Sequence, residues 1–315
     1  MQQAVRKANA TMDSSFLMQS RDTESTLDTI SAMKRQESTG YARGDCFKRH
    51  LSSVPFDIDT ECRKKMSSWQ MQVVDFCRFN RESVEISSQL LDRYLMSNQG
   101  IKALKNRSMF QLAAMTCLYT AVKIHEPEAM DPKLVSNLSR GTYTPRDIEQ
   151  MELELVKTLE WHLNPPTALA FVRLYFNLIP DEAMDQRTRR MAYDVAKFQT
   201  ELAVLEFDFV SIAPSVTAFC SFINALESLD LDRGKIDFMS AILREATGIE
   251  SIPSGQVLDV QSYLYGAVLR HQPVKPPPKP PLPTQTVSPK SVAIRNRSFT
   301  SVLSPHRTFI DEPTV

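Results

Sequence analysis

Residues 108–123 read SMFQLAAMTCLYTAVK and give the clearest indication of the fold. As a helix, this stretch would be apolar on nearly every face, which is typical of a helix at the centre of a bundle. Residues 213–228, which read APSVTAFCSFINALES, have the same character. Two such stretches in one chain predict two helical blocks, each built around a buried central helix.

Amphipathic segments flank both stretches. The first block adds residues 63–79, 82–96, 131–139 and 144–164, and the second adds residues 166–178, 184–206, 235–246 and 257–269. Their apolar side chains recur at helical spacing, so each segment has one face to bury. Thr144, Pro145 and Asp147 form a capping box with proline in the first turn, and Pro165-Pro166 ends that helix. The pattern predicts an all-α protein with two blocks of five helices.

The composition excludes several classes of protein. Glycine is scarce, at 8 of 315 residues, which disfavours folds rich in hairpins. Lysine and arginine balance aspartate and glutamate, so the zero net charge gives no general attraction to nucleic acid. The five cysteines form no CxxC pair, which argues against a zinc ribbon and for reduced thiols in an intracellular protein. No apolar run is long enough for a membrane span.

Catalytic motifs are missing as well. The sequence contains no GxSxG, no glycine-rich phosphate loop and no HExxH, and its five histidines are scattered without ligand spacing. We therefore expect no enzyme activity, no cofactor and no metal site.

Strings spread over residues 62–178 resemble the cyclin box in order and spacing. They are RKKMSSW at 63–69, VVDF at 73–76, LDRYL at 91–95, QLAAMTCLYTAVK at 111–123 and MELELVKTLEWHLNPPT at 151–167. Residues 200–223 are similar to the third-helix region of the second cyclin fold. Within the family, the strings look closest to the divergent cyclins of algal type.

The resemblance implies two tandem five-helix cyclin folds. Residues 51–164 would form the N-terminal cyclin box and residues 165–270 the C-terminal cyclin fold. Residues 1–50 are polar, and we expect a largely disordered tail there, with at most a short helix at its end. Residues 271–315 open with PVKPPPKPPLP at 273–283, which favours polyproline II, and the rest of that tail is rich in serine and threonine.

In cyclins, a lysine after the central helix and a glutamate after a following methionine form one polar pair that contacts the kinase. The matching residues are Lys123 and Glu152, and the family interface positions around them are Ile124, Val156, Trp161 and Leu163. From the residues alone, Lys123 could simply complement the helix C-terminus, Glu152 could be a solvated side chain, and Trp161 could equally be a core residue. The aromatic-Glu-Glu string that usually follows the lysine is replaced by Ile124-His125-Glu126, which predicts a different preference for partners.

Two further sets of residues match family positions. Arg63 and Asp92 correspond to a structural ion pair that ties the first helix of the box to the second. The family's substrate-docking patch is altered here, at Cys62, Lys65, Met66 and Trp69, because lysines at 64 and 65 replace apolar residues. This change puts docking of Arg-x-Leu peptides in doubt.

The C-terminal tail offers weaker signals. Ser288 and Ser304 each precede proline with a basic residue nearby, as proline-directed kinases prefer, although an ordinary tail explains them equally well. Residues 275–281 fit a ligand for an SH3-like groove, although a stiff spacer is the simpler interpretation.

The resemblance implies a regulatory subunit that binds and activates a cyclin-dependent Ser/Thr kinase in cell-cycle control. It also implies a location in the nucleus or cytoplasm, with no nucleic-acid or membrane partner. Two alternatives remain open: a transcription-associated cyclin-fold protein, and a cyclin-fold scaffold that binds peptides without activating a kinase.

Overall fold

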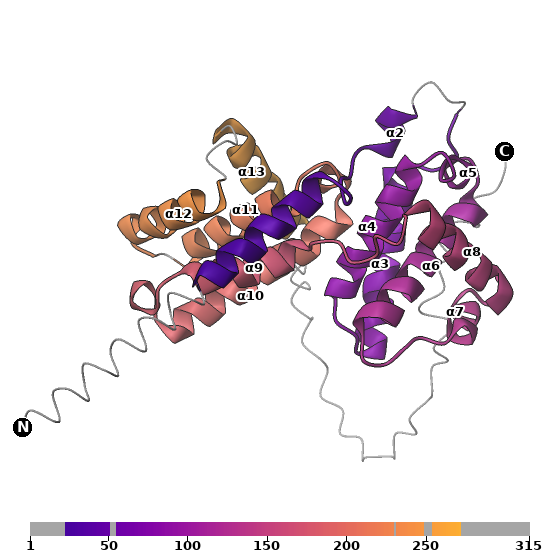
Figure 1. Cartoon of the computed structure of the whole chain (residues 1–315), viewed down its shortest axis with the longest axis horizontal. Coiled ribbons are helices and arrows are strands. Elements are labelled where there is room, and N and C mark those ends of the chain that lie inside the picture. The colour runs from indigo at the N-terminus through magenta and orange to yellow at the C-terminus, as the bar shows by residue number, and fades with distance from the viewer. Residues whose placement is uncertain (1–22, 51–54, 230, 249–253, 272–315) are drawn as a thin grey trace, which may run out of the picture.

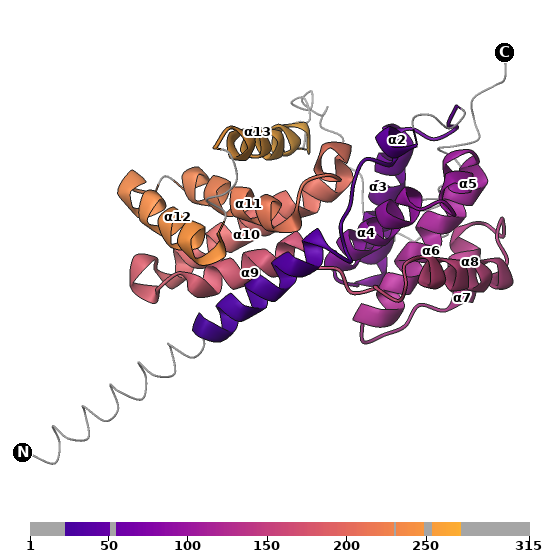
Figure 2. The same cartoon turned by 45° about the horizontal axis from the view of Figure 1, so that its top comes forward.

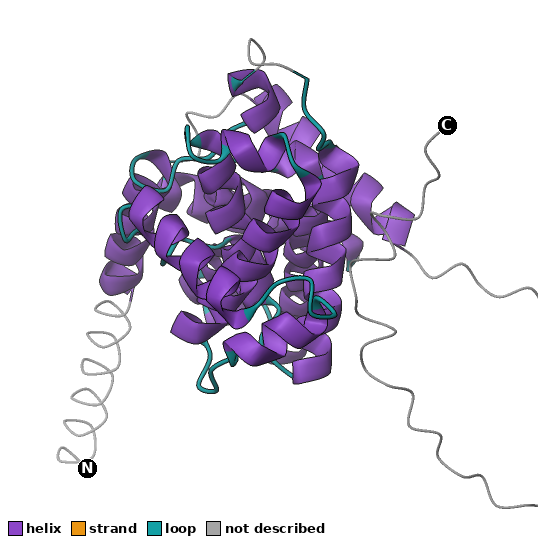
Figure 3. Ribbon diagram, turned by 90° about the vertical axis from the view of Figure 1, so that its right-hand side faces the viewer, coloured by secondary structure: helices purple, strands orange, loops and turns teal. Residues whose placement is uncertain are grey.

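The computed structural model of the chain describes residues 23–50, 55–229, 231–248 and 254–271. Within these residues the secondary structure is entirely helical, and Figure 3 shows helices joined by loops with no strand in the described part. The predicted all-α fold class is therefore confirmed.

The helices follow one another along the chain in two groups. The first group comprises α2 (Cys46–Arg49), α3 (Thr60–Cys77), α4 (Glu82–Met96), α5 (Ile101–Leu104), α6 (Arg107–His125), α7 (Pro132–Leu138) and α8 (Pro145–Thr158). The second comprises α9 (Ala168–Leu178), η1 (Asp181–Ala183), α10 (Gln186–Leu205), η2 (Phe207–Phe209), α11 (Pro214–Ser228), α12 (Arg233–Thr247) and α13 (Ser254–His271).

Each group encloses its own apolar core. In the first, the buried side chains surround α6, where Phe110, Ala114 and Leu118 are almost inaccessible to solvent. In the second they surround α11, where Phe219 and Phe222 are fully buried. Figure 1 shows the two groups side by side, α2 to α8 on the right and α9 to α13 on the left. The two stretches that are apolar on all faces are thus the central helices, as predicted.

One helix ends earlier than its sequence suggests. The stretch that we expected to continue to Pro165 is helical only over α8, and Leu159 caps it. Glu160 (φ 51°) and Trp161 (φ 62°) then adopt left-handed conformations, and the Trp161 amide donates to the Val156 carbonyl at 3.1 Å. A left-handed turn of this kind satisfies the carbonyl groups of the last helical turn and changes the direction of the chain. The helix therefore ends several residues before Pro165, and the proline is not what ends it.

The described part of residues 1–50 contains more helix than the short terminal one that we expected there. Residues 23–38 form a helix that packs on the second group, where Ile30 is buried in the core beside Leu27 and Met33. Figures 1 and 2 both show this indigo helix lying along α9. Glu37 fixes it further, because its carboxylate accepts hydrogen bonds from the Ser215 amide and hydroxyl.

Hydrogen bonds from α4 hold the two groups together. Arg93 donates to the His162 carbonyl at 2.7 Å, and Gln89 donates to the Pro166 carbonyl at 2.9 Å. Glu85 accepts from the Ala168 amide at 2.6 Å, at the start of α9. A carboxylate at this position is stabilised by the positive end of the dipole of α9. Helix α4 therefore caps the first helix of the second group as well as packing in the first core.

Glu85 should make the stability of the protein depend on pH. Burial raises the pKa of this carboxyl to about 7 from 4.5, despite the lowering effect of the Ala168 amide. The folded state therefore holds the proton more tightly than the unfolded state, and the free energy of unfolding should fall as the pH rises from about 4.5 to 7. Glu85→Gln keeps an acceptor for the amide but cannot ionise, so urea denaturation across this range should show a shallower decline.

The exposed Glu149 of α8 supplies the control for that experiment. Glu149→Gln should leave the decline of stability with pH as it is in the unchanged chain. If Glu85→Gln gave the same slope as Glu149→Gln, Glu85 would not be the titrating group.

The predictions for the C-terminal tail lie outside the described residues. These are the phosphorylation sites Ser288 and Ser304, the SH3-like ligand over 275–281, and the expected disorder of 271–315 beyond His271. In the described part of the chain, no helix combines the length and the hydrophobicity needed to traverse a bilayer.

Candidate functional site

Lys123 and Glu152 meet on the surface of the first group. Lys123 Nζ lies 3.1 Å from both carboxylate oxygens of Glu152, and 5.4 Å from the centre of the Tyr119 ring. The Lys123 side chain is 48% exposed and that of Glu152 17%. Although partial burial lowers the pKa of Lys123, its hydrogen bond and charge attraction to Glu152 raise it overall, so the ammonium stays charged.

Two helices bring this pair together from positions 29 residues apart. Lys123 lies in the last turn of α6, whose upstream turns are buried in the core. Glu152 lies in the middle of α8, which begins at the capping box of Thr144 and Asp147 and is anchored by buried Met151 and Leu155. Because both anchors are rigid, the two charged ends are held at fixed positions rather than at the ends of mobile loops.

Exposed apolar side chains stand next to this pair in the sequence. Ile124 follows Lys123 and is 46% exposed, and Leu153 follows Glu152 and is 52% exposed. Trp161, in the left-handed turn after α8, is 76% exposed. Large apolar side chains exposed on the same elements as a charged pair are typical of a surface that another protein covers.

The remaining predicted positions are more enclosed. Val156 is buried, and Leu163 is half-buried against the first core. Trp161 is exposed, so the interpretation of it as a core residue is wrong. Sequence reasoning missed the exposed Leu153. This residue lies outside the inward-facing stripe of Ile148, Met151 and Leu155, and an apolar residue off that stripe could have been recognised as exposed.

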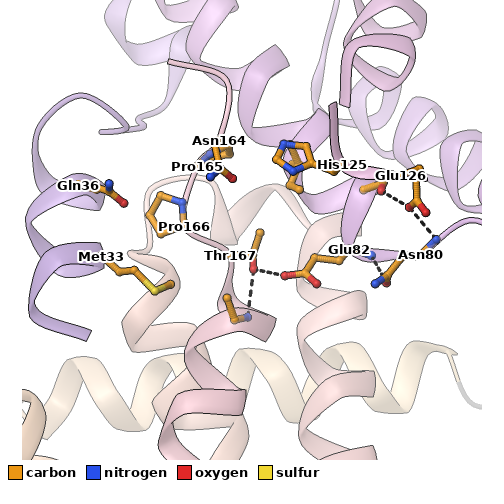
Figure 4. Close-up of a pocket in the computed structure, with 13 residues that line it drawn as sticks. Met33, Gln36, Asn80, Glu82, His125, Glu126, Asn164, Pro165, Pro166 and Thr167 are labelled. Carbon is orange, nitrogen blue, oxygen red and sulfur yellow. Dashed lines mark hydrogen bonds between the residues drawn. The ribbon is translucent and has the colours of Figure 1, made fainter. Parts of the chain in front are cut away.

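A cleft of about 330 Å³ lies between the end of α6, the start of α4 and the start of the second group. Figure 4 shows Met33 and Gln36 of the N-terminal helix on one side and His125 and Glu126, which follow Ile124, on the other. Glu126 accepts hydrogen bonds from the Asn80 amide at 2.9 Å and the Ser83 hydroxyl at 2.6 Å. The end of α6 is thereby fixed to the start of α4.

Arg63 and Asp92 form a buried, bidentate ion pair. Arg63 Nε and Nη2 donate to the two carboxylate oxygens at 2.8 and 2.7 Å, and the side chains are only 5% and 2% exposed. The third nitrogen, Nη1, donates to the Val204 carbonyl at 3.0 Å, near the end of α10. The arginine therefore joins α3, α4 and the second group, a third link that sequence reasoning missed.

The predicted docking patch presents lysine rather than apolar surface. Cys62, Met66 and Trp69 are buried in the first core. Lys65 is exposed, and its neighbour Lys64 pairs with Glu206 at 3.1 Å. A peptide that approached α3 from solvent would meet the lysines first.

Burial determines the state of the cysteine thiols. Cys46, Cys62, Cys77, Cys117 and Cys220 are free thiols, and all but Cys77 are buried. Burial raises the pKa of the Cys46 and Cys220 thiols to about 12, which keeps them protonated and unreactive. Within the described residues, no cluster of three histidine, cysteine or acidic side chains is arranged to hold an ion.

Comparison with known proteins finds a family that this part of the chain is similar to. The family model for the cyclin N-terminal domain matches residues 28–164, which include α6, α8, the ion pairs and part of the N-terminal helix. The match covers a little under half of the chain, and it is this part that resembles the cyclin family. The narrower resemblance to algal-type cyclins stays a prediction.

Curated relatives agree with this assignment at low identity. Mouse G1/S-specific cyclin-D1 is 26% identical over 202 residues, which cover 64% of each chain. The G1/S-specific cyclin-E of Hemicentrotus pulcherrimus is 27% identical over 213 residues, 67% of this chain and 43% of the relative. The matches therefore span about two fifths to two thirds of the relatives' own length.

A solved structure supports the fold. The viral cyclin of herpesvirus saimiri superposes with a TM-score of 0.59, covering 76% of this chain and 97% of the viral protein at 16% identity. The likeness extends beyond the residues of the family model, since that model covers residues 28–164 alone. The division into two tandem cyclin folds, at 51–164 and 165–270, stays a prediction.

Proposed function

We propose that this chain is the regulatory subunit of a cyclin-dependent Ser/Thr kinase, and that it binds the kinase through the surface around Lys123 and Glu152. One observation carries the proposal: a charged pair joins two helices, and the same two helices and the turn after α8 expose Ile124, Leu153 and Trp161. A few polar anchors within an apolar surface is the composition of a protein interface rather than of a catalytic site.

The chain would act by selecting one conformation of its partner. In a protein kinase, a Lys–Glu ion pair must form between a strand and a regulatory helix before the enzyme is active. A rigid surface that fits the inward position of that helix stabilises the active state, and the gain is limited by the difference in affinity for the two states. Lys123 would donate to free carbonyls beside the helix, and Glu152 would keep the ammonium in place.

Substrate docking would differ from that of relatives with an apolar patch. Lys65 is exposed, and Lys64 and Arg270 both pair with Glu206 at the same edge, at 3.1 and 3.4 Å. We expect Arg-x-Leu peptides to bind poorly there, because their arginine would approach lysine side chains and their leucine would find no open apolar groove.

Capture of the full-length chain from its own cells tests the proposed function. The bound fraction is assayed on a Ser-Pro-x-Lys peptide with and without added chain. We expect a kinase whose activity depends on the chain. Capture of no kinase, together with a mobility shift of DNA at low salt, would instead support the transcription-associated alternative; capture of a kinase with unchanged activity would support the scaffold.

Trp161 should contribute to partner binding and not to stability. Its side chain is 76% exposed and its φ of 62° is unfavourable for a bulky residue. Trp161→Ala should therefore weaken kinase binding by about 2 kcal/mol, as buried aromatic anchors do, while the midpoint of thermal unfolding changes little. Phe238→Ala, at an exposed aromatic residue of α12, is the matched control and should leave binding unchanged. Equal binding by both variants would remove Trp161 from the interface.

A further inference from the structure

A groove of about 630 Å³ lies in the second group, between α10, α11 and α13. Val195 and Phe198 of α10 line it from one side, and Tyr265 and Val268 of α13 line it from another. Phe198 is 42% exposed and Tyr265 62% exposed. Grooves with aromatic walls are the surfaces that bind proline-rich segments, which enter as preformed polyproline helices and lose little entropy.

Acidic side chains also border the groove. Asp194 is exposed and makes no ion pair within the described part of the chain. Glu227 is partly neutralised by Arg233, at 3.0 Å. The amide groups in the floor are already engaged, since Asn224 Nδ2 donates to the Gln199 side chain at 3.1 Å. The groove therefore favours a ligand that is apolar and stiff along its length and carries positive charge.

We propose that the occupant of this groove is the chain's own segment 273–283, PVKPPPKPPLP. Seven of its eleven residues are proline, and Lys275 and Lys279 are its charged residues. Prolines supply the stiff apolar ridge that aromatic rings contact, and the lysines match the carboxylates of Asp194 and Glu227. The proposal is independent of kinase binding, which involves the first group.

The segment starts where the groove can be reached. Helix α13 ends at His271, and Tyr265 lies six residues earlier, about 9 Å along the helix axis. The proline-rich run begins two residues beyond the helix, and eleven residues of polyproline II span about 34 Å. With a chain reversal between His271 and Pro273, the run is long enough to pass both Val268 and Tyr265. Because it is tethered, its effective concentration is in the millimolar range, so weak contacts suffice.

Photo-crosslinking of the full-length chain tests the proposal. p-Benzoyl-phenylalanine is placed at position 265 in the groove or, as the control, at position 263. Tyr263 is also an exposed tyrosine of α13, but it does not line the groove. After irradiation of a dilute sample, mass spectrometry should find position 265 joined to residues 273–283 of the same chain, at a yield about fivefold above that from position 263.

Charge reversal provides the second arm. Lys275→Glu/Lys279→Glu should lower the yield at position 265 about threefold, and adding Asp194→Lys should restore much of it, since exposed ion pairs are individually weak. Equal yields at 263 and 265 would overturn the proposal. So would crosslinks that join two chains only, which would make a second copy the occupant, or crosslinks that avoid residues 273–283.

Discussion

Lys123→Ala/Glu152→Ala should abolish activation of the kinase partner while the helix content of the chain stays unchanged. The pair offers an ammonium with three donors and a carboxylate that positions it, 3.1 Å apart at both oxygens. Inside an interface from which water is excluded, carbonyl groups that lose this donor are left unsatisfied. The expected loss is about 2 kcal/mol or more of binding free energy, or about thirtyfold in affinity.

The same change should hardly affect folding. The Lys123 side chain is half exposed, and exposed ion pairs contribute about 0–1 kcal/mol to stability. Circular dichroism and thermal unfolding of the free chain should therefore match those of the unchanged protein. Kinase activity is then measured at several concentrations of the variant, which separates weak binding from failure to activate.

Lys102→Ala/Glu154→Ala is the matched control. It removes a second lysine–glutamate pair that uses the same helix, since Glu154 lies in α8 and pairs with Lys102 at 2.6 Å. Glu154 also accepts from the Tyr94 hydroxyl at 2.6 Å, so this variant should lose more stability than the first. It should nevertheless activate the kinase. Normal activation by a folded Lys123→Ala/Glu152→Ala chain would contradict the proposed site.

The sequence predicts helices well where periodicity and packing agree. The predicted segment 82–96 coincides with α4, and α6 and α11 lie where the two stretches apolar on all faces placed them. The N-terminal helix was missed because its core-facing apolar side chains, buried Ile30 and half-buried Leu27 and Met33, are too few to stand out among polar neighbours. Its order comes from contacts with α9 and α11, which no local pattern encodes.

The geometry of the candidate site could be predicted from the sequence only in part. Nothing local links Lys123 to Glu152 across 29 residues, and only the resemblance to cyclins paired them. The left-handed turn at Glu160 and Trp161 contains no glycine, so the usual signal for the end of a helix was absent. That turn shortened α8 and left Trp161 exposed, and the sequence pattern predicted neither.

Loss of either partner in the buried pair of Arg63 and Asp92 should destabilise the chain severely. Asp92→Ala would leave a guanidinium that is 5% exposed without its carboxylate, and Arg63→Ala would also remove the donor to the Val204 carbonyl. An uncompensated buried charge costs about 3–5 kcal/mol. Urea denaturation should show this loss in each single variant.

A second arginine, Arg81, shows how much of the stability lost with an ion pair is due to burial and how much to hydrogen-bond geometry. It forms the same bidentate arrangement with Asp75, at 2.7 and 2.8 Å, and also reaches α10 through Glu201, but its side chain is 42% exposed. Arg81→Ala should therefore cost only about 1 kcal/mol. Equal losses at Arg63 and Arg81 would mean that hydrogen-bond geometry, and not burial, determines the cost.

The double variant Arg63→Met/Asp92→Leu then shows what the pair is for. Apolar side chains of similar size often replace a buried ion pair with no loss of stability, because the cost of desolvating two charges disappears. We expect this variant to recover most of the stability that the single variants lose. The Val204 carbonyl would still lack its donor, so the end of α10 should exchange its amide hydrogens faster than in the unchanged chain. If stability recovers while the amide hydrogens at the end of α10 exchange faster, Arg63 is the link that orients the second group on the first.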